Sequence, residues 1–196
     1  MFRPRIIPVL LLQGHALVKS VKFKDFRYIG DPINAVKVFN DLKADELVFL
    51  DIDATAQKRT ISLDLVEEVG EEANMPFAVG GGISSIKDIQ NIIAKGAEKV
   101  VLNTSAISKP SFIKEASDNF GSSTIAICID VKTTFLAGKK VWINSGKKRT
   151  NFSPIDFAKI AEEQGAGEII LQSVDRDGKM QGYDLELIKE ISTSVG

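Results

Sequence analysis

The fold of this chain is decided by residues 31–69, which read DPINAVKVFNDLKADELVFLDIDATAQKRTISLDLVEEV. The pattern returns in register 122 positions later, at residues 153–191, as SPIDFAKIAEEQGAGEIILQSVDRDGKMQGYDLELIKEI. Asp53 recurs as Asp175, and apolar positions face apolar positions between the identities. The repeat spans a helix, a strand and a second helix, so it is too long for a solenoid unit of about 20–50 residues. It indicates one half of a larger symmetric domain.

The flanking sequence alternates short apolar runs with amphipathic segments. Continuous apolar runs indicate parallel strands that are covered on both faces. We expect strands at Arg5–Leu12, Glu46–Asp51, Phe77–Val79, Lys99–Leu102, Thr124–Asp130 and Glu168–Gln172. We expect helices at Pro32–Lys43, Ser62–Ala73, Ser85–Lys95, Pro110–Asn119, Pro154–Gln164 and Leu185–Ser192, with Ser84 as one N-cap. Residues Val141–Asn144, followed by Ser145-Gly146, predict an extra hairpin.

Strict alternation of strand and helix leaves a doubly wound open sheet or a (β/α)8 barrel. The repeat favours the barrel, because two half-barrels would be offset by about half of the usual ~250 residues. We therefore expect an α/β fold, a TIM barrel built of two half-barrels, with about six of its eight units in this chain. Residues 1–196 would form one barrel domain, incomplete because units 7 and 8 are absent.

Composition excludes several classes of function. The net charge of −1 gives no electrostatic basis for binding nucleic acid or an anionic membrane, and Lys147, Lys148 and Arg149 are simply interpreted as solvated loop charges. The single cysteine, Cys128, excludes an internal disulfide and fits a reducing compartment. The apolar run near the N-terminus is too short for a signal or membrane segment. With one histidine, His15, we expect no metal site, no cofactor and a cytoplasmic location.

Polar residues gather at the predicted carboxyl ends of the strands, where such barrels hold their active sites. Gly81 and Gly82 precede a helix, so their N–H groups and the helix dipole would suit a phosphate, although a tight turn without a ligand is the alternative. Asn103 and Thr104, at the next strand end, add side-chain donors. This grouping favours a phosphate site.

Asp130 closes an apolar strand, where an unpaired charge is costly. It is either a general acid or base with a raised pKa, or a structural aspartate at the rim. Asp51, Asp53, Asp175 and Asp177 are less specific, because some of them would cap loops.

Aligning the first strand on the fifth places Leu11 opposite Asp130. A symmetric site with two carboxylates would need an acid at position 11. Leucine transfers no proton, so a paired acid–base mechanism loses one member.

Four charges of alternating sign stand at the starts of strands, namely Arg5, Glu46, Lys99 and Glu168. They would form a ring across one end of the barrel, or they are solvated charges at the surface.

Several strings together resemble the cyclase subunit of imidazole glycerol phosphate synthase, HisF. They are RIIPVLLLQG, DELVFLDIDA, VGGGIS, VVLNTSA, AICIDVK, GAGEIIL and SVDRDGKMQGYD, and the resemblance runs the whole length. It implies a (β/α)8 barrel that takes ammonia from a glutaminase subunit docked on the barrel bottom. The ammonia passes through the barrel and condenses with a bis-phosphate ribonucleotide, so the partners are a glutaminase and a phosphorylated small molecule.

The resemblance also assigns roles to positions. Asp130 matches one of two catalytic aspartates, Leu11 stands where the other belongs, and Lys19 matches a lysine near the substrate. The resemblance implies an ammonia gate of salt bridges at Arg5, Glu46, Lys99 and Glu168. Phosphate or substrate contacts are expected from Gly81, Gly82, Asn103, Thr104, Asp51, Asp177 and Gly178.

The chain keeps the charges of the ammonia gate but has leucine in place of one catalytic aspartate. This combination resembles a HisF-like branch in bacterial surface-polysaccharide gene clusters. Its members share a leucine-rich first strand and supply ammonia for an amidino sugar, together with a glutaminase and a sugar amidotransferase. We favour that branch. A histidine-pathway cyclase and a non-catalytic subunit that activates a glutaminase remain as alternatives.

Overall fold

The computed structural model describes residues 4–196. The described chain divides into two compact units. The first comprises the residues up to Lys19 together with Arg27–Val101, and the second comprises Ser20–Phe26 together with Leu102–Gly196. Each unit is described by itself.

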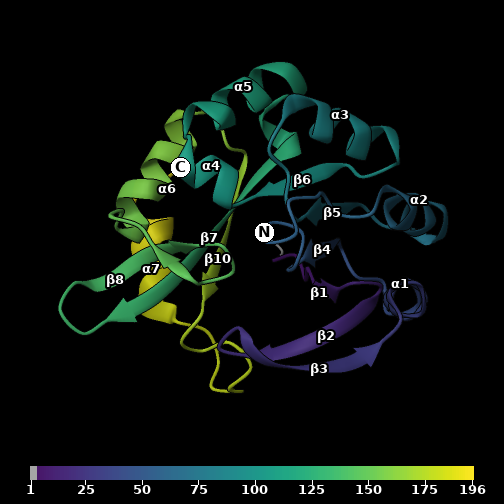
Figure 1. Ribbon diagram of the computed structural model, residues 1–196, viewed down its shortest axis with the longest axis horizontal. Coiled ribbons are helices and arrows are strands. Elements are labelled where there is room, and N and C mark those ends of the chain that lie inside the picture. The colour runs from purple at the N-terminus through teal and green to yellow at the C-terminus, as the bar shows by residue number, and fades with distance from the viewer. Residues whose placement is uncertain (1–3) are drawn as a thin grey trace. The chain divides into compact units, whose positions relative to one another are not determined.

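The first unit contains parallel strands in chain order, β1 (Val9–Gln13), β4 (Leu47–Asp51), β5 (Phe77–Gly80) and β6 (Lys99–Leu102). Figure 1 shows its helices, α1 (Pro32–Asp41), α2 (Leu63–Glu72) and α3 (Ile86–Ala94), along one side of these strands. The core of this unit consists of buried apolar side chains, among them Val36, Val66 and Ile89 on the helices and Val48 and Val79 on the strands.

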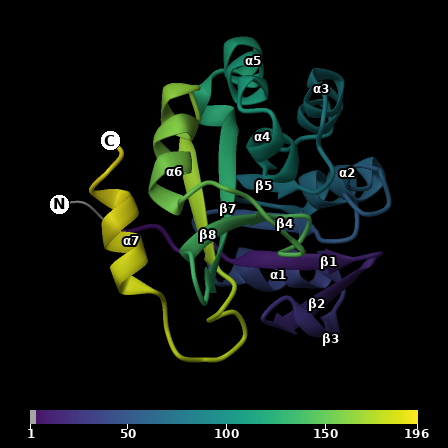
Figure 2. The same cartoon turned by 60° about the vertical axis from the view of Figure 1, so that its left-hand side comes forward.

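The second unit is built around β7 (Ile125–Thr134), which pairs in parallel with β10 (Glu168–Ser173) and antiparallel with β8 (Gly138–Ile143). β9 (Lys148–Arg149) pairs antiparallel with β8. Its helices are α4 (Thr104–Ser108), α5 (Ser111–Phe120), α6 (Pro154–Glu163) and α7 (Leu185–Ser192), with a 3₁₀ turn at Ser122–Thr124. Figure 2 shows α6 beside β7 and α7 beside α6.

All six predicted strands and all six predicted helices are present, and they alternate as six β/α units. The α/β class is confirmed. Pro32 and Pro154 occupy first-turn positions of α1 and α6, where a missing N–H costs nothing. Ser85, not Ser84, is the N-cap of α3, where it forms a capping box with Asp88.

Two boundaries differ from the prediction. β1 begins at Val9 rather than Arg5, because Pro4 and Pro8 carry no N–H for a strand ladder. β7 continues past Asp130 to Thr134, because β8 returns against it as one arm of a hairpin. The predicted hairpin is confirmed, and it turns at residues 144–147.

A second hairpin, β2 (Ala16–Val21) and β3 (Lys24–Gly30), was not predicted. Its two-residue turn places Lys22 and Phe23 at positive φ, 54° and 59°. Such turns usually carry Asn-Gly or a similar pair, so Lys-Phe gives no turn signal in the sequence. The tip of this hairpin, Ser20–Phe26, belongs to the second unit.

Among the described residues, no helix is long and apolar enough to cross a membrane. In the same part of the chain, no group of three or more histidine, cysteine, aspartate or glutamate residues is placed to hold a metal ion.

Candidate functional site

Asp130 lies in β7 of the second unit and is only 6% exposed. Asn103 Nδ2 donates a hydrogen bond to its Oδ2 at 3.3 Å. The Cys128 thiol donates to Oδ1, with 3.6 Å between sulfur and oxygen. Both donors are neutral, so these contacts orient the carboxyl group without supplying a positive charge.

Burial raises the pKa of Asp130 from 3.8 to about 7. The hydrogen bonds from Cys128 and Asn103 lower it, and the negative charge of Asp177 raises it, but the loss of solvation is the largest effect. The carboxyl group therefore populates both its acid and its base form near neutral pH. This is the setting that a proton-transfer group requires.

Two further polar side chains share the face of Asp130. Its direct partner in β8 is Trp142, and its direct partner in β10 is Gln172. Directly paired residues point to the same side of a sheet. Lys132, two residues along β7, places its Nζ 4.8 Å from the centroid of the Trp142 ring. The indole N–H of Trp142 is the one buried side-chain polar atom without a hydrogen-bond partner among the described residues.

Sequence reasoning missed Trp142, Gln172 and Lys132. Trp142 and Gln172 lie outside the quoted motifs, Lys132 is only the last residue of AICIDVK, and their common face follows only from the strand register. The register of β8 was not foreseen, because its turn was placed from Ser145-Gly146 without fixing where the strand begins. The one available signal is that the chain contains a single tryptophan.

Asn103 and Thr104, which the sequence grouped with Gly81 and Gly82, are engaged by protein groups of the second unit. Asn103 Nδ2 also donates to the carbonyl of Cys128 at 2.9 Å. Thr104 Oγ1 donates to Asn103 Oδ1 at 3.1 Å and accepts from the N–H of Asn144 at 3.0 Å. The pair therefore links Asp130 to the turn after β8.

Asp177 and Gly178 tie the loop after β10 to the tip of the β2–β3 hairpin. Asp177 Oδ2 accepts from Ser20 Oγ at 2.7 Å and from the N–H of Phe23 at 3.1 Å. Gly178 has φ +67°, and a Cβ there would lie 2.0 Å from the carbonyl oxygen of Ser20. Only glycine permits this approach, so the predicted Gly178 position has a clear packing reason in addition to its proposed ligand role.

Gly81 and Gly82, in the first unit, pack against the loop after β4. A Cβ on Gly82 would lie 1.8 Å from the carbonyl oxygen of Arg59. Asp51 anchors the same loop, because its carboxylate binds Arg59 Nη1 at 2.5 Å and accepts from the N–H groups of Asp53 and Ala54. These contacts give Gly82 and Asp51 a packing role in the strand-to-helix turn.

The start of α3, which follows these glycines, is already capped. Asp88 Oδ2 accepts from the N–H groups of Ser84 and Ser85 at 3.0 and 2.9 Å. A phosphate at this turn would therefore have to use other N–H groups.

Leu11 lies in β1 of the first unit, with Leu50 of β4 and Val18 of β2 as its direct strand partners. Its partners on this face are apolar and bring no side-chain donor. Lys19 lies in β2 and is exposed, as a mobile ammonium group near a substrate would be.

Three of the four strand-start charges form one cluster in the first unit. Glu46 is 2% exposed. Its carboxylate binds Arg5 Nη1 at 2.8 Å and Lys99 Nζ at 3.0 Å. The alternative of solvated surface charges is therefore wrong for Glu46. Glu168 begins β10 in the second unit.

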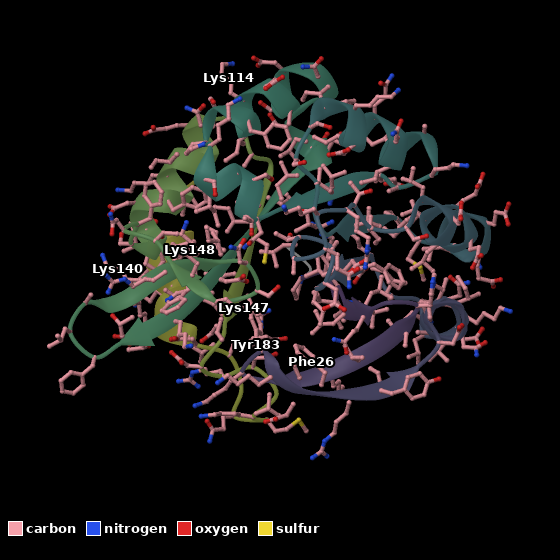
Figure 3. The ribbon with its side chains drawn as sticks, in the orientation of Figure 1. Phe26, Lys114, Lys140, Lys147, Lys148 and Tyr183 are labelled. Carbon is pink, nitrogen blue, oxygen red and sulfur yellow. The ribbon has the colours of Figure 1, made fainter. Side chains whose placement is uncertain are left out.

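The charges on the β8–β9 hairpin behave differently. Lys147, Lys148 and Arg149 are exposed, as predicted. Figure 3 shows Lys140, Lys147 and Lys148 directed outward from this hairpin.

Replacing Asp130 by asparagine is expected to change how stability depends on pH. Between about pH 4 and pH 7 the native carboxyl keeps a proton that the unfolded chain has lost, so stability falls as pH rises through this window. The rise in the pKa of Asp130 from 3.8 to about 7 corresponds to at most ~4 kcal/mol in the free energy of unfolding. We expect urea unfolding to show that the stability of Asp130→Asn, relative to the unmodified protein, is higher at pH 8 than at pH 5. The same pH dependence in both proteins would contradict the buried, near-neutral carboxyl.

Comparison with known proteins places this geometry in a family. Residues 5–196 match the family described as histidine biosynthesis protein. The chain is 44% identical to a putative imidazole glycerol phosphate synthase subunit HisF of Leptospira interrogans, over 97% of this chain and 75% of that protein. It is 42% identical to a putative subunit hisF2 of Pseudomonas aeruginosa, over 100% of this chain and 78% of that protein.

A third relative is the imidazole glycerol phosphate synthase subunit HisF of Methanocaldococcus jannaschii, 44% identical over 100% of this chain and 79% of that protein. The match over nearly the whole chain agrees with the six observed β/α units and with the predicted TIM-barrel class. The chain therefore belongs to the histidine biosynthesis protein family, as a HisF-type member of its cyclase and lyase enzymes.

Proposed function

We propose that this chain is a HisF-type synthase subunit that receives ammonia from a partner glutaminase and delivers it to a phosphorylated acceptor in the biosynthesis of an amidino sugar for surface polysaccharide. The observation that carries the proposal is Leu11. The family resemblance expects a second catalytic aspartate there, while Asp130 keeps a buried setting suited to proton transfer. A sugar amidotransferase would be the further partner.

Ammonia would enter at the strand-start charges. Glu46, Arg5 and Lys99 form a buried cluster that suits a gate, and Glu168 would complete it. A glutaminase would dock over this end of one barrel domain to which the chain contributes six units. The carboxylate of Glu46 is buried and bound by two cations, so it is not an open anion that would trap ammonium.

The acceptor would be held by its phosphates. Gly81, Gly82, Asn103 and Thr104 would bind one phosphate group, Asp177 and Gly178 would contribute to a second, and Asp51 and Lys19 would complete the substrate contacts. Asn103 and Thr104 already form hydrogen bonds within the protein. A phosphate would therefore be bound by the N–H and O–H groups of this cluster that are still able to donate. Asp130 would transfer protons during the addition of ammonia.

A histidine-pathway cyclase is the second candidate. The 44% identity to the imidazole glycerol phosphate synthase subunit HisF of Methanocaldococcus jannaschii favours it. In that case another group would replace the acid missing at position 11. A third candidate, a non-catalytic activator of a glutaminase, predicts that glutaminase stimulation persists while phosphorylated ligands do not bind.

Complementation of a histidine auxotroph distinguishes the first two candidates. We expect the full-length gene to fail in a strain that lacks its own HisF, although the protein is expressed in soluble form. The matched control is the same strain with a genuine HisF gene in the same vector. Growth without histidine, supported by the unmodified gene, would overturn the amidino-sugar proposal.

A further inference from the structure

The strand-end carboxylates differ in how far their oxygens are already used. Asp51 is bound by Arg59 and by two backbone N–H groups. Asp177 is bound by Ser20 and Phe23. Asp175 accepts from the N–H of Thr133 at 2.7 Å. These three carboxylates hold loops in place, so they are poor choices for moving a proton.

Asp130 is different, because each of its carboxylate oxygens accepts a hydrogen bond from one neutral donor. Cys128 serves Oδ1 and Asn103 serves Oδ2. Both donors are neutral, whereas the carboxylate of Asp51 contacts the guanidinium of Arg59. Unlike those three, Asp130 can gain and lose a proton without breaking a loop contact.

We propose that Asp130 acts as a single proton-transfer group that both gives and takes the proton, and that the Cys128 thiol is the positioning residue that holds it for this task. The proposal rests on the proposed function, because it assumes addition of ammonia at a carbonyl-type carbon. It explains how the chemistry can proceed with leucine at position 11.

Asp130 alone can supply and accept every proton that the addition of ammonia requires. As the nitrogen of ammonia forms its bond to the carbon, the carbon–oxygen π bond breaks and the carboxylic acid of Asp130 gives its proton to the oxygen. The nitrogen is then an ammonium group, and the carboxylate takes one proton from it. Asp130 is restored, and the product is a neutral amino alcohol. Loss of water repeats the exchange, with the proton given to the leaving hydroxyl and recovered from nitrogen.

Cys128 is suited to hold this group by its place in β7. It lies two residues before Asp130, on the same face of the strand, and it is buried. The same burial raises the pKa of its own thiol well above the ordinary value, so it stays a donor. A permanent neutral donor at Oδ1 fixes the rotation of the carboxyl group.

The groups around Asp130 on the neighbouring strands add no competing proton donor. Lys132, on the same strand, stands over the Trp142 ring. Trp142 of β8 and Gln172 of β10 do not titrate in this range, and Glu168 lies at the far end of β10. Asp177 acts on Asp130 only through its charge.

Titration of the Asp130 carboxyl carbon by ¹³C NMR tests the role of Cys128 without any substrate. The protein is labelled at aspartate, and Asp130→Asn assigns the signal. We expect Cys128→Ala to raise the titration midpoint by about 0.5–1 pH unit, because the hydrogen bond that favours the carboxylate is lost. Cys128→Ser keeps a donor and should keep the midpoint near that of the unmodified protein, or below it.

Val131→Ala is the matched control, because it removes buried volume from the opposite face of the same strand. An unchanged midpoint in Cys128→Ala, or an equal shift in Val131→Ala, would overturn the positioning role. If Cys128→Ala does not fold, Cys128→Ser alone provides the test. A titration midpoint in Cys128→Ser that is about 0.5–1 pH unit above that of the unmodified protein would then overturn the positioning role. Failure of the proposed function would show differently, as growth of the histidine auxotroph, and would leave this titration unaffected.

Discussion

Replacing Leu11 by aspartate is expected to give the full-length protein imidazole glycerol phosphate synthesis from ammonium salts at a rate at least ~100-fold above that of the unmodified protein. A positioned acid or base contributes about 10²–10⁴-fold to a rate. Leu11 lies among apolar strand partners, Leu50 and Val18, so a carboxyl group there would be partly desolvated and would keep a proton more readily than in water. The measurement is product formation from the bis-phosphate ribonucleotide that the HisF resemblance names.

Leu11→Asn is the matched control for this gain, because its side chain has the same shape but does not ionise. We expect Leu11→Asn to remain at the level of the unmodified protein. Adding Asp130→Asn to Leu11→Asp should remove the gain, since the paired mechanism needs both acids. Equal rates in Leu11→Asp and Leu11→Asn would show that the missing acid is not the reason for a lack of cyclase turnover.

Replacing Glu46 by alanine is expected to lower the free energy of unfolding by about 3–5 kcal/mol. Removing one partner of a buried ion pair leaves the other charge without compensation, which costs about this much. The Lys99 side chain is 15% exposed, so its ammonium would lose both contacts to Glu46 while remaining largely out of water. Arg5, at 50% exposure, would turn to solvent and add little. Urea unfolding measures the loss.

The exposed pair Lys114–Asp118 supplies the control for Glu46. Both of these side chains are 58% exposed, and they lie four residues apart on α5. Asp118→Ala should cost no more than about 0.5 kcal/mol, as exposed helix pairs do. A loss for Glu46→Ala as small as that for Asp118→Ala would contradict the buried cluster on which the ammonia gate is proposed.

The order of strands and helices could be predicted because the repeat and the apolar runs each involve many residues. The β2–β3 hairpin could not be predicted, because it depends on one turn, and the residue types Lys22 and Phe23 do not indicate positive φ angles. The β1 boundary was misplaced for a related reason. The apolar run begins at Ile6 and Ile7, but Pro4 and Pro8 beside them carry no N–H for a strand ladder.

The site residues, too, fall into those that the sequence could predict and those that depend on side-chain rotation or strand register. Asp130 and Asn103 were each predicted at a strand end, but the hydrogen bond between them was not foreseen. Cys128 was recognised only as an unpaired thiol, since its contact with Oδ1 of Asp130 depends on side-chain rotation. Trp142 and Gln172 required the register of β8 and β10. The burial of Glu46 overturned the interpretation of solvated charges, which charge pattern alone favours.

Imidazole glycerol phosphate formation by the unmodified full-length protein tests the central claim most directly. The protein is combined with its partner glutaminase, glutamine and the bis-phosphate ribonucleotide, and in parallel with ammonium salts in place of glutamine. If Leu11 marks a subunit that serves another acceptor, glutamine is hydrolysed but no imidazole glycerol phosphate forms under either condition. Measurable cyclase turnover, above all with ammonium salts alone, would contradict the account.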